Sequence, residues 1–334
     1  MKIAFFASSL VSAYSNGAAT YYRGIVRALA ERGHAITCFE PDVYERQSHR
    51  DLADPPWAEV VVYPATDDGA LRMVERARGS DLVVKASGVG VGDALLERAV
   101  LELASPATTI AFWEVDAPAT LDRVRRDPTD PFRALVPRFD LVFTCGGGQP
   151  VVDAYQRLGA RRCAPIHHAL DPSTHHPAPP DLRFQGALGF LGDRMPDRAR
   201  RVDDLFFGAA RRLLDRRFLL GGAGWGDETL PPNVHHLGHV DPSDLDAFHG
   251  TPLAALVVSR DALTAYGFWP EARVFAAAGA GACVITDAWE GGEPFLSPGD
   301  EVLVACDGDQ VAAHLASLTQ TRARAIGERA LARM

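Results

Sequence analysis

The chain has 334 residues, 47% of them hydrophobic and 23% charged, which is the composition of a soluble globular protein. Because this length exceeds the usual size of one hydrophobic core, two domains are expected. The formal net charge is −9, from 34 basic and 43 acidic residues, and no long basic run occurs, which argues against a nucleic-acid or anionic-membrane partner.

In the first half of the chain, apolar strand-like runs alternate with helical patterns. Residues 2–7 are expected to form a buried first strand, and residues 18–32 a helix that ends at Gly33. Further strands are expected in AITCF, EVVVYPA, DLVVKAS, TTIAFWEV and DLVFTCG, with helices near 69–78, 92–103 and 150–158. Such continuously apolar strands, separated by helices, indicate a parallel sheet covered on both faces.

The alternation breaks between residues 165 and 180, where five prolines occur. Residues 169–181 are therefore interpreted as a linker between an N-terminal domain, 1–168, and a C-terminal domain, 182–334. The pattern then restarts as GALGFLG, a helix over about 197–214, RFLLGG, VHHLGHV, LAALVVS, an alanine-rich helix, ACVITD, EVLVA and a last helix from about 308. We expect two Rossmann-like, doubly wound α/β domains facing across a cleft, with ligands at the carboxyl ends of the strands.

The segment after the first strand is a loop of about ten residues without the G-x-G-x-x-G fingerprint of dinucleotide binding. Glu40, at the end of the second strand, is the one residue that favours NAD. A loop of this length suits contact with a bulky second substrate, although an ordinary surface loop is an equally good interpretation. The candidate binding residues in and after this loop are Ser9, Tyr14, Asn16, Gly17 and Tyr21.

Two carboxylates follow the strand in AFWEVDAPAT. Glu114 and Asp116 lie at its carboxyl end, where either is a candidate general base that takes a proton from a hydroxyl. A turn or helix cap ahead of Pro118 is the alternative for Asp116. Lys85 and Ser87, at another strand end, are candidates for positioning a substrate.

The second domain begins with a strand, a glycine and a basic helix start in GFLGDRMPDRARR. Gly192 allows close backbone approach, and Arg194 and Arg198 lie before or within the first helical turn. Helix amides and guanidinium groups together suit a phosphate. A solvated basic turn paired with nearby aspartates is the alternative.

The strand in NVHHLGHV ends near Gly238. The backbone of His239 and Val240 at this end can read the flat edge of a base, although an ordinary strand end has the same sequence.

A loop and a helix of small residues follow in YGFWPEARVFAAAGAGA. Pro270 suits the first helical position, and the loop before it offers amide donors to a phosphate. Small residues from 276 to 282 predict close helix packing, so the chemistry is expected in the flanks. The loop residues are Tyr266, Gly267, Phe268 and Trp269.

No metal site is expected, because the histidine pairs at 167–168, 175–176 and 235–236 lack supporting carboxylates. Five widely spaced cysteines without a Cys-x-x-Cys pair predict reduced thiols in a cytoplasmic protein. No segment is long and apolar enough to span a membrane. A signal peptide in MKIAFFASSLVSA is a minor alternative to the buried strand.

Together these motifs resemble the spore-maturation, CgeB-like branch of glycosyltransferases with the GT-B fold. The resemblance rests on YGFWPEARVFAAAGAGACVITDAWEG, FLSPGDEVLVA, NVHHLGHV and GFLGDRMPDR in the second half, and on YYRGIVRAL and VDAPAT in the first. It implies a nucleotide-sugar donor held by the C-terminal domain. It also implies an acceptor (a glycan, a protein or a small natural product) held by the N-terminal domain, and transfer without a cofactor or an obligatory metal.

The resemblance also assigns donor roles to residues of the second half. Arg194 and Arg198 would bind the diphosphate, His239 and Val240 the base, and the loop from Gly267 to Trp269 the phosphates or sugar. Ser259 stands where an Asn is common.

Ala276 departs from the family pattern, which usually has a Glu that binds the donor ribose. A non-catalytic nucleotide-sugar or glycan binder is therefore a second hypothesis. A nucleotide-sugar epimerase of the same fold is a third, and an NAD-dependent enzyme a fourth.

Overall fold

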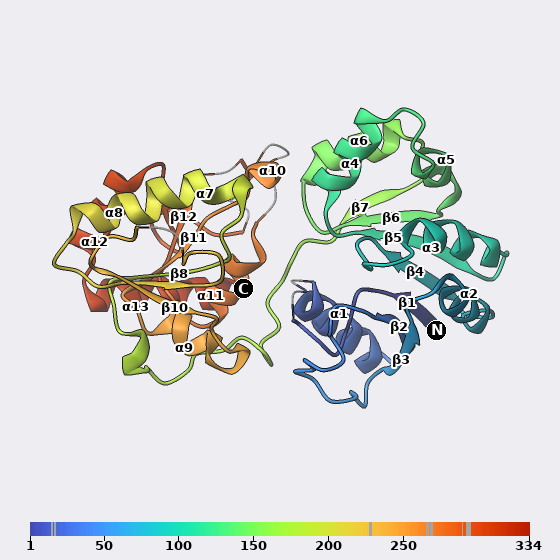
Figure 1. Cartoon of the computed structure of the whole chain (residues 1–334), viewed down its shortest axis with the longest axis horizontal. Helices are drawn as coiled ribbons and strands as arrows, with labels where there is room; N and C mark the ends of the chain where they lie inside the picture. The colour runs from blue at the N-terminus through green and yellow to red at the C-terminus, as the bar shows by residue number, and fades with distance from the viewer. Residues whose placement is uncertain are drawn as a thin grey trace. The chain divides into compact units, whose positions relative to one another are not determined.

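The computed structural model describes residues 1–14, 16, 18–226, 229–264, 267, 270–288, 290–291 and 295–334. The chain divides into two compact units, Met1–His167 and His168–Met334. Figure 1 traces the chain from β1 in blue to α13 in red and shows a sheet flanked by helices in each unit. Residues 169–181, predicted to be a linker, belong to the second unit, where Leu170 and His175 approach Gly279 closely.

In the described residues of the first unit, seven parallel strands form a sheet in the order β3-β2-β1-β4-β5-β6-β7. The strands are β1 Lys2–Phe6, β2 Ala35–Asp42, β3 Glu59–Pro64, β4 Leu82–Ala86, β5 Thr109–Glu114, β6 Leu141–Thr144 and β7 Cys163–Pro165. The helices are α1 Ala19–Glu31, α2 Asp67–Arg76, α3 Asp93–Ala99, α4 Ala117–Arg126, α5 Phe132–Leu135 and α6 Gly148–Arg157. The strand order reverses between β1 and β4, which is the switch point of a doubly wound sheet.

Aromatic residues on neighbouring strand positions face opposite sides of this sheet. Phe5 contacts Tyr22 of α1 and Trp113 of β5, with ring centroids 5.2 and 5.7 Å away. Phe112, next to Trp113, instead contacts Phe132 of α5 at 4.8 Å. Because successive side chains of a strand alternate between the faces, α1 covers one face and α5 the other. Burial on both sides explains the continuous apolar runs of the strands.

In the described residues of the second unit, six parallel strands form a sheet in the order β10-β9-β8-β11-β12-β13. They are β8 Leu188–Leu191, β9 Phe218–Gly221, β10 Val234–Gly238, β11 Ala254–Val257, β12 Val284–Asp287 and β13 Leu303–Ala305. The helices are α7 Pro196–Val202, α8 Gly208–Arg212, α9 Leu245–Gly250, α10 Asp261–Thr264, α11 Ala272–Gly279, α12 Gly308–Ser317 and α13 Gln320–Arg333. The π-helical segment Asp203–Phe207 joins α7 to α8.

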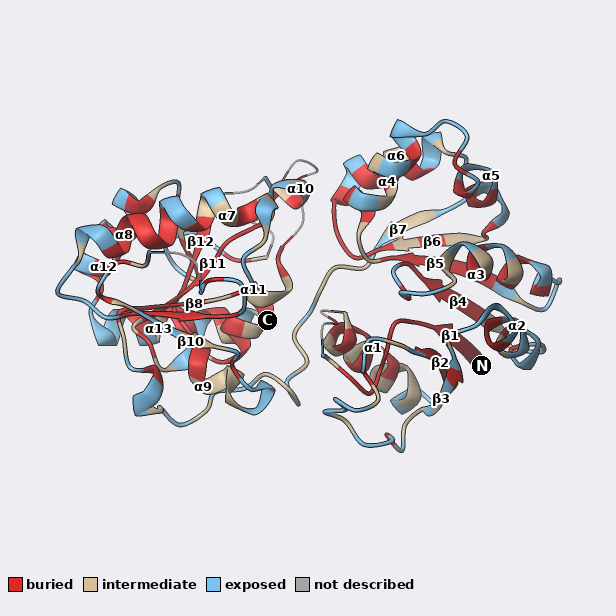
Figure 2. Cartoon of the chain, viewed as in Figure 1, coloured by how far each residue is buried: buried red, intermediate tan, exposed pale blue. Residues whose placement is uncertain are grey.

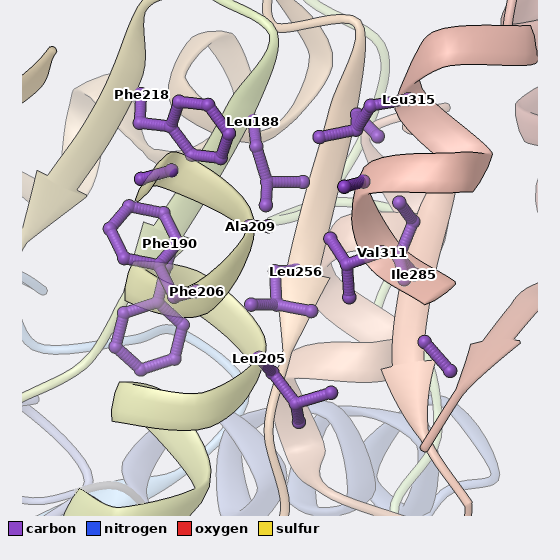
Figure 3. Packing of buried hydrophobic residues seen from close by; sticks show 14 of the residues in the cluster. Leu188, Phe190, Leu205, Phe206, Ala209, Phe218, Leu256, Ile285, Val311 and Leu315 are labelled. Atoms are coloured by element: carbon purple, nitrogen blue, oxygen red, sulfur yellow. The ribbon is translucent and has the colours of Figure 1, made fainter. Parts of the chain in front are cut away.

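The larger core of this unit lies between the sheet and the helices α7, α8 and α12. Phe190 of β8 and Leu256 of β11 pack there with Phe206 and Val311 (Figure 3). The opposite face carries smaller residues, including Ala277 of α11. Figure 2 shows the central strands of both sheets, such as β4, β5, β8 and β11, in the colour of buried residues, whereas the edge strands β3 and β10 are mostly intermediate or exposed. The prediction of two parallel-sheet, Rossmann-like domains is confirmed.

Helix boundaries differ from the sequence predictions in three places. The helix expected over 197–214 contains the π-helical segment, and the last helix is two, because the chain is extended at Leu318 and Thr319 between α12 and α13. The structure also adds α4, α5, α9 and α10 to the expected set. Pro270 is not the first residue of α11, because Glu271 has an extended backbone and is the N-cap.

No helix in the described part of the chain is long and apolar enough to cross a membrane. Within the same residues, no group of three or more His, Cys, Asp or Glu side chains is placed to hold a metal ion. All five cysteines are free thiols.

Candidate functional site

The turn after β8 places the Arg198 guanidinium against the backbone of Gly192. A Cβ at residue 192 would stand 2.5 Å from Nη2 of Arg198, so any larger residue here would displace the guanidinium from this position. Nη2 donates to the Asp193 carbonyl at 2.8 Å, and the guanidinium carbon lies 5.8 Å from the centre of the Phe190 ring. Arg198 therefore packs under the turn, with 2% of its surface exposed.

The electrostatics of Arg198 are those of a poorly compensated cation. Burial, followed by the positive charge of Arg273, lowers the pKa of Arg198 to about 10, so the side chain remains protonated at neutral pH. Among the described residues, its Nε has no hydrogen-bond partner. A buried donor without an acceptor is uncommon and costly. An anion bound at this turn would relieve that cost.

Arg194 lies in the same turn and is exposed, unlike Arg198. Its amide donates to the Ala223 carbonyl at 2.9 Å, which ties the turn to the end of β9. Arg273, in the first turn of α11, is half-buried and lies 4.0 Å from the carboxylate of Glu271. Arginines from two elements thus contribute positive charge at the carboxyl edge of this sheet.

Ser259 is hydrogen-bonded within the protein. Its amide and its hydroxyl both donate to Oδ1 of buried Asp287 at 3.0 Å. Arg201 completes the group by donating to Oδ2 of Asp287 at 2.8 Å and to Asp261 at 2.6 Å. This arrangement ties the ends of β11 and β12 to α7 and α10. Asp287 and Arg201 were not among the residues predicted from the sequence. An acid directly at the end of a strand, as Asp287 is at the end of β12, is nevertheless a signal that could have pointed to this group.

The other predicted donor residues differ in accessibility. His239 is exposed, whereas the Val240 side chain is buried with Phe248, so Val240 offers only its backbone to a ligand. Gly267 has a left-handed φ of 64° and donates its amide to the Thr264 carbonyl at 3.2 Å. Tyr266, Phe268 and Trp269 lie outside the described residues, as does Gly17 of the first loop.

Glu114, at the end of β5, is fully buried in the first unit. Its Oε1 accepts from the Ser87 hydroxyl at 2.6 Å and from the Asp116 amide at 2.8 Å, and its Oε2 accepts from the Tyr155 hydroxyl. Ser87 also accepts from the Val115 amide at 2.9 Å. Both oxygens of Glu114 are therefore occupied, and the geometry supports a structural role for Glu114 and Ser87 rather than the roles predicted for them.

Asp116 is the half-buried N-cap of α4, as the alternative interpretation of its sequence position predicted. Its Oδ1 accepts from the Ala119 amide at 3.5 Å, which is a long hydrogen bond. Of the two candidate bases, Asp116 is therefore the one whose carboxylate reaches the surface.

Most of the predicted acceptor residues bind other parts of the protein. Lys85 is fully buried, donates to the Ala86 carbonyl at 2.8 Å and pairs with Asp93. Asn16 donates to the Ser9 carbonyl at 3.0 Å, and the Tyr21 hydroxyl donates to the Ile166 carbonyl at 2.6 Å.

Ser9 and Tyr14 complete this set. The Ser9 hydroxyl accepts from the Ser12 amide at 3.1 Å, within the loop. Tyr14 differs from the others because 43% of its surface is exposed.

Glu40 binds the backbone of the first loop through its carboxylate. Its Oε2 accepts from the Leu10 amide at 2.7 Å and its Oε1 from the Gln47 side chain at 2.8 Å, and only 1% of the residue is exposed. A carboxylate used in this way is not available to a ribose. The NAD hypothesis thus loses the residue on which it rested.

Comparison with known proteins adds independent findings. Residues 200–334 match a family model described as "Glycosyl transferase-like". The structure of sucrose-phosphate synthase from Thermosynechococcus elongatus aligns with 100% of this chain over 94% of its own length, with a TM-score of 0.71 and 14% sequence identity. The structure of Anabaena HepE in complex with UDP and glucose aligns with 99% of this chain over 94% of its own length, with a TM-score of 0.65 and 16% sequence identity. The chain has the GT-B fold of glycosyltransferases.

A third GT-B structure is an α-glucosyltransferase in complex with UDP-glucose and DNA containing an abasic site. It matches 99% of this chain with 94% of its own, at a TM-score of 0.70 and 14% identity. Among curated proteins, no sequence matches the chain. The assignment to the CgeB-like branch of GT-B proteins stays a prediction.

Proposed function

We propose that this GT-B protein is a glycosyltransferase that moves a sugar from a nucleoside-diphosphate sugar to a hydroxyl or amine acceptor, without a cofactor or a metal. The observation that carries the proposal is the buried, protonated guanidinium of Arg198 beneath a glycine turn, with Arg194 exposed in the same turn. The matched structures that contain UDP or UDP-glucose, and the glycosyl transferase-like family model, support it.

The proposed chemistry follows from this charge. As the bond between the anomeric carbon and the phosphate oxygen breaks, negative charge grows on the departing diphosphate. A preorganised guanidinium in a dry site stabilises that charge more than water does. The acceptor oxygen or nitrogen forms the new bond to the anomeric carbon and loses its proton. If the reaction inverts the anomeric configuration, Asp116 is the proposed base; a retaining reaction needs no side-chain base.

Ala276 favours a second candidate function, a non-catalytic nucleotide-sugar binder. The residue lies within α11, where the resembled family usually has a ribose-binding Glu. Such a protein would bind the nucleotide sugar and neither transfer nor hydrolyse it. An epimerase would instead change the sugar without an acceptor. Incubation of the protein with a bound nucleotide sugar, followed by product analysis, separates the three.

The first test measures the binding of UDP, dTDP, GDP and ADP to the protein, by calorimetry and by the rise in melting temperature. We expect one nucleoside diphosphate to bind and Arg194→Ala to weaken it. One charge-assisted hydrogen bond contributes about 1.5–3 kcal/mol, so the Kd should rise roughly 10- to 150-fold.

The control is Arg200→Ala, which removes the same charge from an exposed position of α7. This variant should bind the nucleotide as the parent protein does. If Arg194→Ala and Arg200→Ala weaken binding equally, the effect is one of general charge and the diphosphate assignment is wrong.

A further inference from the structure

Three residues on two loops of the first unit present exposed rings. Tyr14 follows β1, Tyr44 and His49 follow β2, and Tyr14 and Tyr44 expose 43% and 55% of their surfaces. The rings of Tyr14 and His49 stack in parallel, with centroids 4.1 Å apart and an interplanar angle of 11°. Tyr14, Tyr44 and His49 are called the aromatic platform below.

The Tyr14–His49 side of the platform is held by polar contacts, most of them partly buried. The Ser12 hydroxyl donates to the His49 carbonyl at 2.8 Å and accepts from the Tyr14 amide at 3.3 Å. Asp51 accepts from the Ala13 amide at 2.8 Å and from both terminal nitrogens of Arg23, each at 2.8 Å. Because these contacts join the two loops, the stacked rings lose little conformational freedom when a ligand binds.

Tyr44 is held in an unusual backbone conformation. Tyr44 and Glu45 have left-handed φ values of 57° and 56°. The Tyr44 hydroxyl donates to the Gly90 carbonyl at 3.2 Å, in the loop after β4. A Cβ on residue 90 would lie 2.8 Å from the Tyr44 ring, so glycine is needed for this approach. Strained backbone of this kind clusters at binding and catalytic sites.

A buried cation lies beside the exposed Tyr44 ring. The guanidinium carbon of Arg46 is 5.1 Å from the ring centroid, Nη1 donates to the Ser8 carbonyl at 3.0 Å, and only 6% of Arg46 is exposed. Among the described residues, Nε of Arg46 has no hydrogen-bond partner. The platform thus combines flat apolar surfaces with a hydrogen-bond donor that lacks an acceptor.

The position of the platform in the fold is that of a ligand site. The loops after β1, β2 and β4 all lie at the carboxyl edge of the parallel sheet, and the strand order reverses between β1 and β4. Ligands of open α/β sheets bind at this edge, beside the switch point.

We propose that the aromatic platform binds the acceptor of the transfer reaction, and that this acceptor is a saccharide with a pyranose ring stacked on Tyr14 or Tyr44. A pyranose has a face of polarised C–H bonds, which the negative face of an aromatic ring attracts. The proposal rests on the proposed function, because it names the acceptor class of that glycosyltransferase.

Saturation-transfer NMR on the full chain tests this assignment. The saccharide probes are the methyl pyranosides of glucose, galactose and mannose, together with maltose and cellobiose; 4-nitrophenol is the flat aromatic probe and glycerol the open-chain polyol. We expect at least one saccharide to bind through C–H protons of one ring face. At least one of Tyr14→Ala and Tyr44→Ala should weaken this binding about tenfold or more, and Tyr14→Phe should retain it.

The control variant is Leu71→Ala, at a residue of α2 exposed to 46% of its surface and outside the platform. The saccharide assignment is overturned if no saccharide binds, if only 4-nitrophenol binds, or if both Tyr→Ala variants bind as Leu71→Ala does.

Nucleotide titration of the same variants separates this proposal from the proposed function. Unchanged nucleotide binding by Tyr14→Ala and Tyr44→Ala shows that the donor site is intact, and an unchanged unfolding transition of the fragment 1–167 carrying each substitution shows that the first unit is folded. Tyr14-dependent saccharide binding without any nucleotide binding keeps the platform as a glycan site and overturns the transferase. Nucleotide binding without saccharide binding overturns only the platform.

Discussion

Glu114 and Asp116 are two residues apart, yet their surroundings give them different capacities. Glu114 is fully buried and accepts three hydrogen bonds, so both of its oxygens are engaged and water is excluded. Asp116 is half-buried, and its carboxylate accepts a long cap bond. A general base must reach the proton it removes, so accessibility decides between two residues of the same chemistry.

At the residue scale, His249 makes the stability of the protein dependent on pH. The side chain is 4% exposed, and burial, followed by the positive charges of His175 and Arg273, lowers its pKa from 6.5 to about 3. The folded state therefore keeps His249 neutral, whereas the unfolded chain binds a proton below pH 6.5. This contribution is absent at neutral pH, and it lowers the free energy of unfolding as the pH falls from 6.5 towards 3.

We expect that His249→Phe removes this dependence. The free energy of unfolding of the parent protein, minus that of the variant, should fall by about 1.4 kcal/mol for each pH unit between roughly pH 6 and 4. Urea unfolding at several pH values measures the difference. The control is the same substitution at exposed His235 of β10. A difference that stays constant with pH would show that His249 does not titrate in this way.

At the scale of elements, α11 and α13 pack at a distance that small residues permit. Gly327 of α13 lies against the turn after α11, and a Cβ added to it would stand 2.1 Å from the Gly281 carbonyl oxygen. That oxygen belongs to the backbone, so no side-chain rotation can move it. The small residues of α11, predicted to allow close packing, thus have a counterpart in α13.

Gly327→Ala should destabilise the protein, although alanine favours a helix over glycine by about 1 kcal/mol. Forced expansion of a packed contact costs roughly 1–3 kcal/mol, and a rigid backbone places this case at the upper end. We expect a net loss of about 1–2 kcal/mol in urea unfolding. Glu328→Ala, at an exposed residue of the same helix, should change stability by less than about 0.5 kcal/mol. A Gly327→Ala protein at least as stable as its parent would contradict the close approach.

At the scale of the whole molecule, each unit has a complete sheet and its own core. The core of the second unit is built from residues of that unit, and so is the turn that carries Arg194 and Arg198. Neither the sheet nor this turn needs a strand from residues 1–167.

The fragment 168–334 should therefore fold alone and bind the nucleoside diphosphate. We expect a cooperative unfolding transition and a Kd within about tenfold of the full chain, since the proposed charge-assisted contacts lie within this unit. Calorimetry on fragments 168–334 and 1–167 compares the two. Nucleotide binding by residues 1–167 alone would contradict the placement of the donor site.

The sequence by itself determined the two-domain α/β architecture. Strands that are buried on both faces are continuously apolar, so they can be recognised from the local sequence without knowing which strands they pair with. The sequence also offered the Asp116 cap as one of two interpretations, since a cap acts within its own helix turn. Only the tertiary structure decided which polar residues are hydrogen-bonded to other parts of the protein and so are not available to a ligand. Glu114 meets Tyr155 across 41 residues, Leu10 meets Glu40 across 30, and Ser259 meets Asp287 across 28. Contacts at such separations leave no local pattern, because folding alone brings the partners together.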